Sequence, residues 1–159
     1  MRVALYQPDI PQNTGTILRM AACLNVTVEV IGPAGFDIST RALRRAGLDY
    51  LDRVAIERHV SFAEFDRSRR ERGARLLLLT TAGAASYTEF RYAPGDILLA
   101  GRESAGVPPD VHEAADARLK MPMSTGLRSL NVAVALAMVL GEALRQTGQF
   151  DSPSGIPRT

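Results

Sequence analysis

The chain has 159 residues, of which 46% are hydrophobic, and this suits one domain of ordinary size with a sufficient core. Its formal net charge is only +2, and its single cysteine rules out an intramolecular disulfide framework and fits a reducing compartment. No charged-then-apolar leader precedes the first expected strand, and no apolar run reaches the roughly twenty residues of a membrane helix, so a cytoplasmic protein is expected.

The first part of the chain predicts two strands joined by a helix. Arg2–Tyr6 is mostly apolar and predicts a strand, whereas two prolines and a glycine in residues 7–15 predict a loop. A helix is expected over Thr16–Leu24, in which Cys23 lies on an apolar face and is expected to be a core thiol. The β-branched run Val26–Ile31 predicts the second strand.

Arginine is concentrated in the middle of the chain. Residues 41–75 hold ten arginines against six acidic residues, and the planar guanidinium suits forked contacts with phosphate. A solvated helix face, or codon bias in a GC-rich genome, would explain the same excess. Ser39 can cap a helix that runs through Ala46. Three basic residues lie along this helix at spacings of three and four: Arg41, Arg44 and Arg45.

A weaker strand and a capped helix are predicted next. Arg53–Glu57 predicts the strand, and Ser61-Phe-Ala-Glu64 matches a capping box for a helix that ends at Gly73. The polar segment 68–72 of this helix is expected to be exposed to solvent.

The remainder of the chain predicts three strands and a long apolar helix. Arg75–Thr81 contains four leucines in succession and predicts a strand covered on both faces. Asp96–Ala100 and Ala117–Lys120 predict two more strands. Residues 130–141 belong to the last helix, which is so apolar that it must pack against the sheet, a second subunit or both.

Strand and helix thus alternate through most of the sequence. This order predicts an α/β fold with an open, mostly parallel sheet and helices on both faces. Residues 1–149 are expected to form a single domain, and residues 150–159 are expected to form a mobile tail.

Three loops marked by glycine or proline follow short apolar runs in the last third of the chain. They are Gly101–Pro108, Met121-Pro-Met123 and residues 124–131. Loops at strand ends are where ligands sit, and glycine lets the backbone approach a ligand closely. Ser129 and Asn131 stand where the last helix begins, so each is able either to cap that helix or to contact a ligand.

Several common chemistries have no support in the sequence. Neither of the widespread glycine-rich phosphate-binding motifs occurs, which weakens a nucleotidase or dehydrogenase function. His59 and His112 are far apart, and no cysteine or carboxylate cluster has metal-ligand spacing, so no metal site is expected. The chain also lacks the nucleophile elbow of many hydrolases.

Three motifs in order resemble a known family. The first is Pro8-Asp-Ile-Pro11-x-Asn13-x-Gly15-x-x-x-Arg19, the second is Gly101-x-Glu103-x-x-Gly106-x-Pro108, and the third is Met121-Pro-Met123 followed by Ser129-Leu-Asn131. This pattern resembles the SPOUT-class RNA 2′-O-ribose methyltransferases. Within that class the chain is most similar to the small TrmL-like tRNA enzymes, which act on the wobble cytidine or uridine. The similarity runs from residue 1 to about residue 148.

The resemblance implies a cofactor, a partner and an unusual topology. Members of the class have a C-terminal deep trefoil knot, a rare exception among protein folds, and they act as homodimers. They bind S-adenosylmethionine (SAM) in the knot, largely through backbone groups of three loops. Carried onto this chain, the cofactor contacts are Leu79, Thr80, Gly101, Met121 and Ser129, with Glu103, Gly106 and Asn131 shaping the site.

The resemblance also implies roles in binding tRNA. Asn13 and Arg19 are expected to handle the ribose and its phosphate as catalytic residues, with the turn from loop to helix bringing both to the substrate. Because a guanidinium stays protonated, Arg19 is expected to clamp phosphate and polarise the 2′-hydroxyl group rather than act as a base. Phosphates of the tRNA anticodon stem-loop are expected to contact the three arginines of the 41–45 segment.

The resemblance leaves two alternative functions open, and the sequence departs from the family pattern at one point. The same chemistry could act on another tRNA position or on ribosomal RNA, and a non-catalytic RNA-binding factor could share the fold. Ala133 and Val134 stand where close relatives often carry Ser and Asn, so the dimer or the site differs there in detail.

Overall fold

A single parallel sheet organises the molecule. The structure is a computed structural model that describes residues 1–39, 41, 53–83 and 85–150. Every described strand pair is parallel, and the strand order is β3-β2-β1-β6-β4-β7-β5. The strands are β1 (Arg2–Tyr6), β2 (Thr27–Ile31), β3 (Ile56–His59), β4 (Leu76–Leu79), β5 (Ala85–Ser86), β6 (Ile97–Ala100) and β7 (Ala117–Lys120). The described helices are α1 (Pro11–Cys23), α3 (Phe62–Glu71), α4 (Pro109–Ala114) and α5 (Val132–Thr147).

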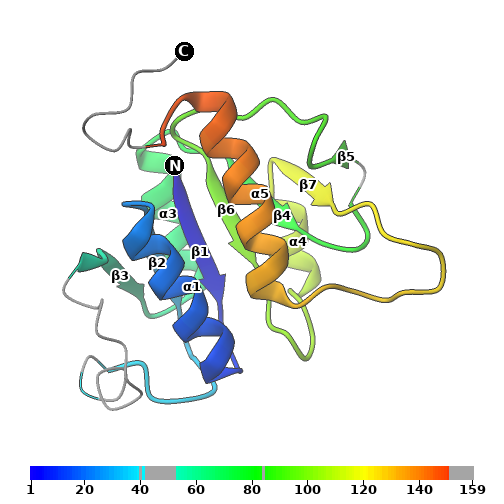
Figure 1. Cartoon of the computed structure of the whole chain (residues 1–159). Helices are drawn as coiled ribbons and strands as arrows, with labels where there is room; N and C mark the ends of the chain where they lie inside the picture. Colours follow the sequence, from blue (N-terminus) through cyan, green and yellow to red (C-terminus); the bar gives the residue numbers. More distant parts are fainter. Residues whose placement is uncertain (40, 42–52, 84, 151–159) are drawn as a thin grey trace.

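Helices cover both faces of the sheet, as the sequence predicts. In Figure 1, α1 and α5 lie side by side on one face, and α3 and α4 lie on the other. Alternate residues of β1 supply the two cores, because successive side chains of a strand point to opposite faces. Val3 and Leu5 pack in the core under α1 and α5, whereas Ala4 and Tyr6 pack in the core on the side of α3 and α4.

Most predicted strands agree with the structure. β1 and β7 have the predicted bounds, and β2, β4 and β6 each begin one residue later than predicted. β4 also ends two residues earlier than predicted, at Leu79. The prediction for β3 is wrong by two to three residues, because the ladder with β2 pairs Val28 with Ile56 and Ile31 with His59. The two-residue strand β5 and the short helix α4 were not predicted.

The first helix begins earlier than the sequence predicts. Residues 11–15, expected as a loop, form the first turn of α1, and Pro11 is the first helical residue. Proline is favoured there because the first N–H groups of a helix have no intrahelical partner, so a missing N–H costs nothing. Asn13 therefore lies on the helix rather than on a flexible connection.

Cys23 is exposed, which contradicts its predicted place in the core. The buried side of α1 consists of Thr14, Ile17, Leu18 and Ala21, at the spacing of one helix face. Cys23 lies off that face, so the apolar residues around it in the sequence did not indicate its burial.

Arg69 corrects the expectation that segment 68–72 is exposed. Its side chain is only 3% exposed and makes ion pairs with Asp66 (2.6 Å) and Asp116 (2.8 Å). It also donates to the carbonyl oxygens of Ala74 (3.2 Å) and Ala114 (2.9 Å). The guanidinium is therefore a structural connection between α3, the end of α4 and the start of β4.

α5 has a cap at each end. Asn131 is its N-cap residue, and the Asn131 side chain accepts hydrogen bonds from the N–H groups of Ala133 (2.8 Å) and Val134 (3.3 Å). Gly148 ends the helix in the left-handed conformation, with φ of 66°. One side of α5 is buried on the sheet, but Val134 and Met138 are 49% and 44% exposed. None of the described helices has the length and apolar content to span a membrane.

Candidate active site

A cavity of about 510 Å³ opens where β4, β6 and β7 end, beside the first turn of α5. The carboxyl ends of parallel strands meet at one edge of a sheet, which is where open α/β sheets bind ligands. The volume of this cavity lies within the range of small-molecule binding sites. All eight residues predicted to contact or shape a cofactor site line this cavity: Leu79, Thr80, Gly101, Glu103, Gly106, Met121, Ser129 and Asn131.

The loop after β6 forms a tight wall of the cavity. Arg102 and Gly106 exchange two backbone hydrogen bonds of 3.0 and 2.8 Å, which close the loop. A Cβ atom on Gly101 would lie 2.8 Å from the carbonyl carbon of Gly106, closer than real Cβ contacts come. Gly106 has φ of 64°, a conformation that L side chains rarely adopt. Glycine is thus required at both positions by the backbone geometry.

Asparagine side chains connect the cavity to α1 and α5. The Asn131 amide donates to Asn13 Oδ1 at 2.9 Å, and the Asn13 amide donates to Glu103 Oε1 at 3.2 Å. Asn13 itself lines the cavity. The fold therefore brings together residues of all three motifs.

Asp9, which was not predicted as a site residue, belongs to the same network. Its carboxylate accepts hydrogen bonds from the N–H groups of Glu103 (3.1 Å) and Ser104 (3.4 Å) and from the Ser104 hydroxyl group. Burial raises the pKa of Glu103, and the adjacent Asp9 raises it further. Hydrogen bonds from Glu103 and Ser104 in turn hold the pKa of Asp9 well below its usual range. The position of Asp9 within the first motif was the one available signal.

Arg19 is not part of the cavity wall. It is exposed on α1, six residues after Asn13. With 3.6 residues per turn, that spacing places the two side chains on different sides of the helix. The predicted turn from loop to helix does not exist, because both residues lie on α1, and the single chain does not bring them together.

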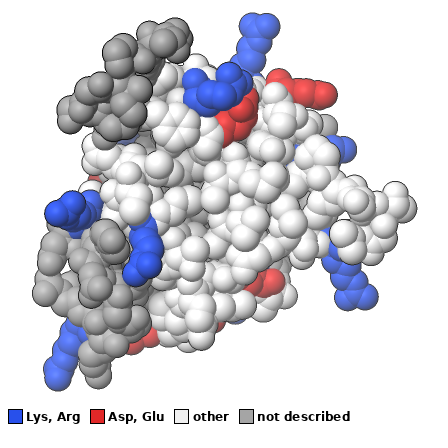
Figure 2. All heavy atoms as spheres, in the orientation of Figure 1, with Lys and Arg blue, Asp and Glu red and all other residues white. Residues whose placement is uncertain are grey.

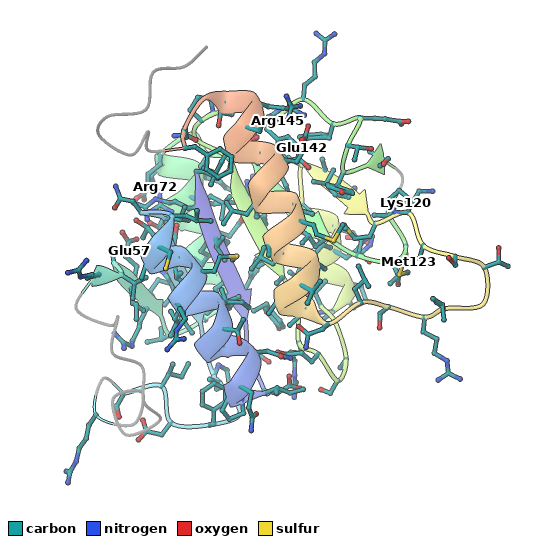
Figure 3. The ribbon with its side chains drawn as sticks, in the orientation of Figure 1. Glu57, Arg72, Lys120, Met123, Glu142 and Arg145 are labelled. Carbon is teal, nitrogen blue, oxygen red and sulfur yellow. The ribbon has the colours of Figure 1, made fainter. Side chains whose placement is uncertain are left out.

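Further residues that line the cavity were not predicted as site residues. They include Ile10 at the start of α1, Met123 after β7, and Leu130 and Val132 around the start of α5. Figure 3 shows Met123 on the loop that follows β7. Ile10, Met123 and Leu130 lie within the three motifs, and this was the available sequence signal, whereas Val132 lies outside them.

Comparison with known proteins assigns this arrangement to a family. The profile of the SpoU rRNA Methylase family matches residues 1–141, which include the cavity loops and the asparagine network. The chain belongs to this SpoU methylase family. Membership implies the SPOUT fold, with the C-terminal trefoil knot that the three motifs suggest.

Individual SpoU relatives are similar over more than 90% of this chain. A tRNA (cytidine(34)-2'-O)-methyltransferase of Beijerinckia indica subsp. indica is 59% identical over 98% of each chain. A solved structure concerned with 2-OH methylation of C/U34 on tRNA is 45% identical, with a TM-score of 0.84 over 91% of this chain and 94% of the other. An AdoMet-bound rRNA methyltransferase of Sinorhizobium meliloti is 29% identical, with a TM-score of 0.82, over 91% of this chain but only 55% of its own length.

Of the three arginines predicted to contact RNA in this SpoU-family chain, one lies in the part of the chain that the structure describes. Arg41 is exposed, whereas Arg44 and Arg45 lie outside the described residues. The body of the helix predicted over residues 39–46 and the predicted tail beyond residue 150 lie outside them as well. These expectations remain predictions.

Other arginines of the 41–75 segment have structural partners. Four of them are ion-paired within the chain, so their number alone does not measure an RNA-binding surface. Arg69 and Arg70 pair with Asp66, Arg72 pairs with Glu29 and Glu57, and Arg75 pairs with Asp96. Figure 3 shows Arg72 beside Glu57.

One group in the described part of the chain has the residue types of a metal site. Glu29, Glu57 and His59 come within reach of a common point. The two carboxylates are already paired, because Arg2 lies 3.2 Å from Glu29 and 2.8 Å from Glu57, and Arg72 contacts both. His59 Nε2 lies 2.8 Å from Glu29. With two guanidinium groups in place, this cluster is an ion-pair network rather than a cation site.

Proposed function

We propose that this chain transfers a methyl group from SAM to the ribose 2′-oxygen of the wobble pyrimidine, position 34, of tRNA. The observation that carries this proposal is the single cavity wall shared by residues of all three motifs, in a chain 59% identical to a named tRNA (cytidine(34)-2'-O)-methyltransferase. Similarity over 98% of both chains supports the same reaction rather than a shared fold alone.

The cavity has the chemistry that the cofactor needs. Leu79 and Met121 supply apolar surface for an adenine ring, while the loop from Gly101 to Gly106 brings backbone groups close to the ligand. The eight cofactor residues of the sequence prediction would hold SAM there. Bound SAM supplies a methyl group attached to a positively charged sulfur, and no metal ion is required for its transfer.

Positioning of the ribose is the main task left to the protein. Transfer would form a bond between the methyl carbon and the ribose 2′-oxygen, with the sulfur keeping the electron pair of the broken carbon–sulfur bond and the hydroxyl proton released to water. Correct placement of the two reacting atoms supplies a large part of such rate accelerations. Asn13, at the cavity, would orient the ribose, and Arg19 would bind an adjacent phosphate through its permanent positive charge.

An apolar surface supports a homodimer. Large hydrophobic side chains are exposed around the start of α1 and along the start and outer side of α5: Ile10, Leu127, Leu130, Val134 and Met138. Figure 2 shows this face of the molecule with a broad uncharged middle and most charged side chains near its margin. A second copy would cover these side chains, as interface cores are depleted in charge.

The combined surface of the dimer would hold the anticodon stem-loop. Arg41, Arg44 and Arg45 are the proposed phosphate contacts, because arginine binds phosphate in a forked geometry. A protein that modifies tRNA in this way would act in the cytoplasm.

Methylation of ribosomal RNA is the second candidate. The family description and the Sinorhizobium meliloti relative both name rRNA. That relative has a much longer chain, of which this protein matches only 55%, so the tRNA reaction has the stronger support.

The test is transfer of labelled methyl from SAM to bulk tRNA from cells that lack this gene, followed by digestion and location of the modified nucleotide. We expect a 2′-O-methylated pyrimidine at the wobble position, with little incorporation into tRNA from cells that retain the gene. Modification elsewhere would keep the reaction and overturn the substrate. Cofactor binding without transfer to tRNA would direct the assay to ribosomal RNA, and absence of both would favour a non-catalytic RNA-binding factor.

A further inference from the structure

The polar network at the cavity has one consistent direction. Asn131 uses its oxygen to cap α5, so its amide group is left to donate to Asn13. Asn13 accepts that bond through Oδ1 and donates through Nδ2 to Glu103 Oε1. Each donor thus points towards the carboxyl group of Glu103. Chains of hydrogen bonds with one direction strengthen one another in a poorly solvated site.

Glu103 is poorly suited to carry a negative charge. Its Oε1 receives one hydrogen bond, and its Oε2 is buried without any hydrogen-bond partner in the described part of the chain. An ionised carboxylate taken out of water is strongly destabilised unless donors surround both oxygens. A proton on Oε2 would make that atom a donor, and the adjacent Asp9 carboxylate is an available acceptor.

Asp9 has the donors that Glu103 lacks. Two backbone N–H groups and the Ser104 hydroxyl group donate to it, and Arg102 Nε lies 3.8 Å from its Oδ2. Arg102 is the cation that the structure places beside Asp9. The hydrogen bonding therefore places the single negative charge of the pair on Asp9.

We propose that Asp9 is a positioning residue that fixes the loop after β6 and holds Glu103 as a neutral acid, with its proton directed to Asp9 and its Oε1 directed to Asn13. This inference rests on the proposed function, because a neutral carboxyl group matters most beside a positively charged sulfonium. The wall that carries Glu103 then presents no full negative charge to the bound cofactor.

A neutral wall has a kinetic advantage. A carboxylate beside the sulfonium would stabilise the charged ground state more than the transition state, in which the positive charge on sulfur is disappearing. Binding that is stronger in the ground state than in the transition state slows the chemical step. The proposal therefore predicts that the site has little preference for SAM over its uncharged product, S-adenosylhomocysteine (SAH).

The first test measures this preference by calorimetry on the full-length protein from weakly acidic to weakly alkaline pH. Glu103→Gln, a neutral isostere, should leave the ratio of SAM to SAH affinity within about threefold of wild type, less than the tenfold change of one pKa unit. In Asp9→Asn, loss of the neighbouring charge should let Glu103 ionise at lower pH. In Asp9→Asn the ratio of SAM to SAH affinity should therefore rise at a lower pH than in the wild type. This rise should be absent when Asp9→Asn is combined with Glu103→Gln.

Two further measurements separate positioning from general damage. Asp9→Asn should lower kcat for methyl transfer about 10- to 100-fold through misplacement of the loop and Asn13. Glu71→Gln changes an exposed residue of α3 and is the matched control. It should change neither kcat nor the ratio of SAM to SAH affinity. Infrared spectroscopy of the ligand-free protein should show the carbonyl band of a protonated carboxylic acid, which disappears in Glu103→Gln and remains in Glu71→Gln.

Three results would overturn the inference: no such band in the wild type, a tenfold or larger loss of SAM preference in Glu103→Gln, or an Asp9→Asn protein that behaves like the Glu71→Gln control. Thermal unfolding of each variant shows whether it is folded. If the wild type binds neither SAM nor SAH, the proposed function fails, while the infrared result still decides whether Glu103 is neutral.

Discussion

At the scale of single residues, the shape of the cavity depends on a glycine position that has no room for a Cβ atom. Gly101 has no room for a Cβ atom against the backbone of Gly106, whereas a Cβ on Gly95 would meet nothing within 4 Å. Both glycines flank β6, so the pair separates the effect of the cavity loop from the general effect of losing a glycine.

Gly101→Ala should distort the loop after β6, because backbone rather than a flexible side chain occupies the space. We expect a loss of about 1–3 kcal/mol in the free energy of unfolding, typical of overpacking. Affinity for SAM should fall about tenfold or more, which is 1.4 kcal/mol or more. Denaturant unfolding and calorimetry measure the two effects. Gly95→Ala should change stability by no more than about 0.5 kcal/mol, as surface substitutions usually do. Equal SAM affinity in both variants would contradict the assignment of this loop.

Arg19→Ala tests a residue outside the cavity. We expect kcat/KM for tRNA to fall about 10²- to 10³-fold, the size of effect seen when a preorganised charged contact is lost. The Kd for SAM should stay within about twofold, since Arg19 does not line the cavity. Transfer assays and calorimetry on the same preparation distinguish these effects. Near wild-type transfer would remove Arg19 from the catalytic group.

At the scale of elements, α5 combines a site at its start with an anchor at its end. Glu142 accepts hydrogen bonds from Arg145 and Gln146, and Gln146 also donates to the carbonyl oxygen of Phe90 at 3.0 Å. Figure 3 shows Glu142 and Arg145 together near the C-terminal end of the helix. The Gln146 contacts connect the C-terminal end of α5 to the segment before β6.

Glu142 makes part of this anchor dependent on pH. Hydrogen bonds from Arg145, and then Gln146, lower the pKa of Glu142 from 4.5 to about 2. Because the folded pKa is lowered, the stabilisation is complete above pH 4.5 and is lost as the pH falls towards 2. Glu142→Gln should therefore destabilise the protein at neutral pH by less than about 1 kcal/mol, as for surface ion pairs. Urea unfolding should show this difference vanish near pH 2, and a constant difference across the range would exclude the ion pair as its cause.

The strands were predictable from the sequence, but several contacts between elements were not. Apolar runs such as Leu76–Leu79 predict a buried strand because both faces of a parallel sheet are covered. The bounds of β3 depend on its ladder with β2, and the burial of Arg69 depends on carbonyl groups of distant segments. Local pattern does not contain that information.

The candidate site was likewise predictable in its loop residues but not in its contacts between distant segments. The motif resemblance selected Glu103 and Asn131, and both residues line the cavity. It did not select Asp9, whose partners lie more than ninety residues further along the chain. It also joined Asn13 and Arg19, which a helix beginning at Pro11 separates. Side-chain hydrogen bonds that connect distant loops become visible only in the folded chain.

At the scale of the whole molecule, the exposed side of α5 is the feature that a monomer does not explain. Contiguous exposed apolar surface commonly marks an interaction site. The same surface adjoins the cavity, because Leu130 is both exposed and part of the cavity wall. Dimer formation and cofactor binding are therefore expected to influence each other.

Val134→Asp tests the dimer. Burial of an unpaired carboxylate in an interface costs several kcal/mol, so the variant should be mostly monomeric at concentrations where the wild type is a dimer. Sedimentation velocity measures the change. Val60→Asp is the matched control, because Val60 is 83% exposed and lies at the end of β3, away from α5, and it should leave the oligomeric state unchanged. A monomeric wild type, or a dimeric Val134→Asp, would contradict the proposed interface.

The internal pairing of arginines also affects how the protein would respond to ionic strength. Binding of RNA releases condensed counterions, and the logarithm of the binding constant falls with the logarithm of salt concentration by about 0.7 to 0.9 for each phosphate neutralised. Arg69, Arg70, Arg72 and Arg75 already face carboxylates within the chain. They would contribute little to that slope, so tRNA binding should tolerate salt better than a count of eighteen arginines suggests.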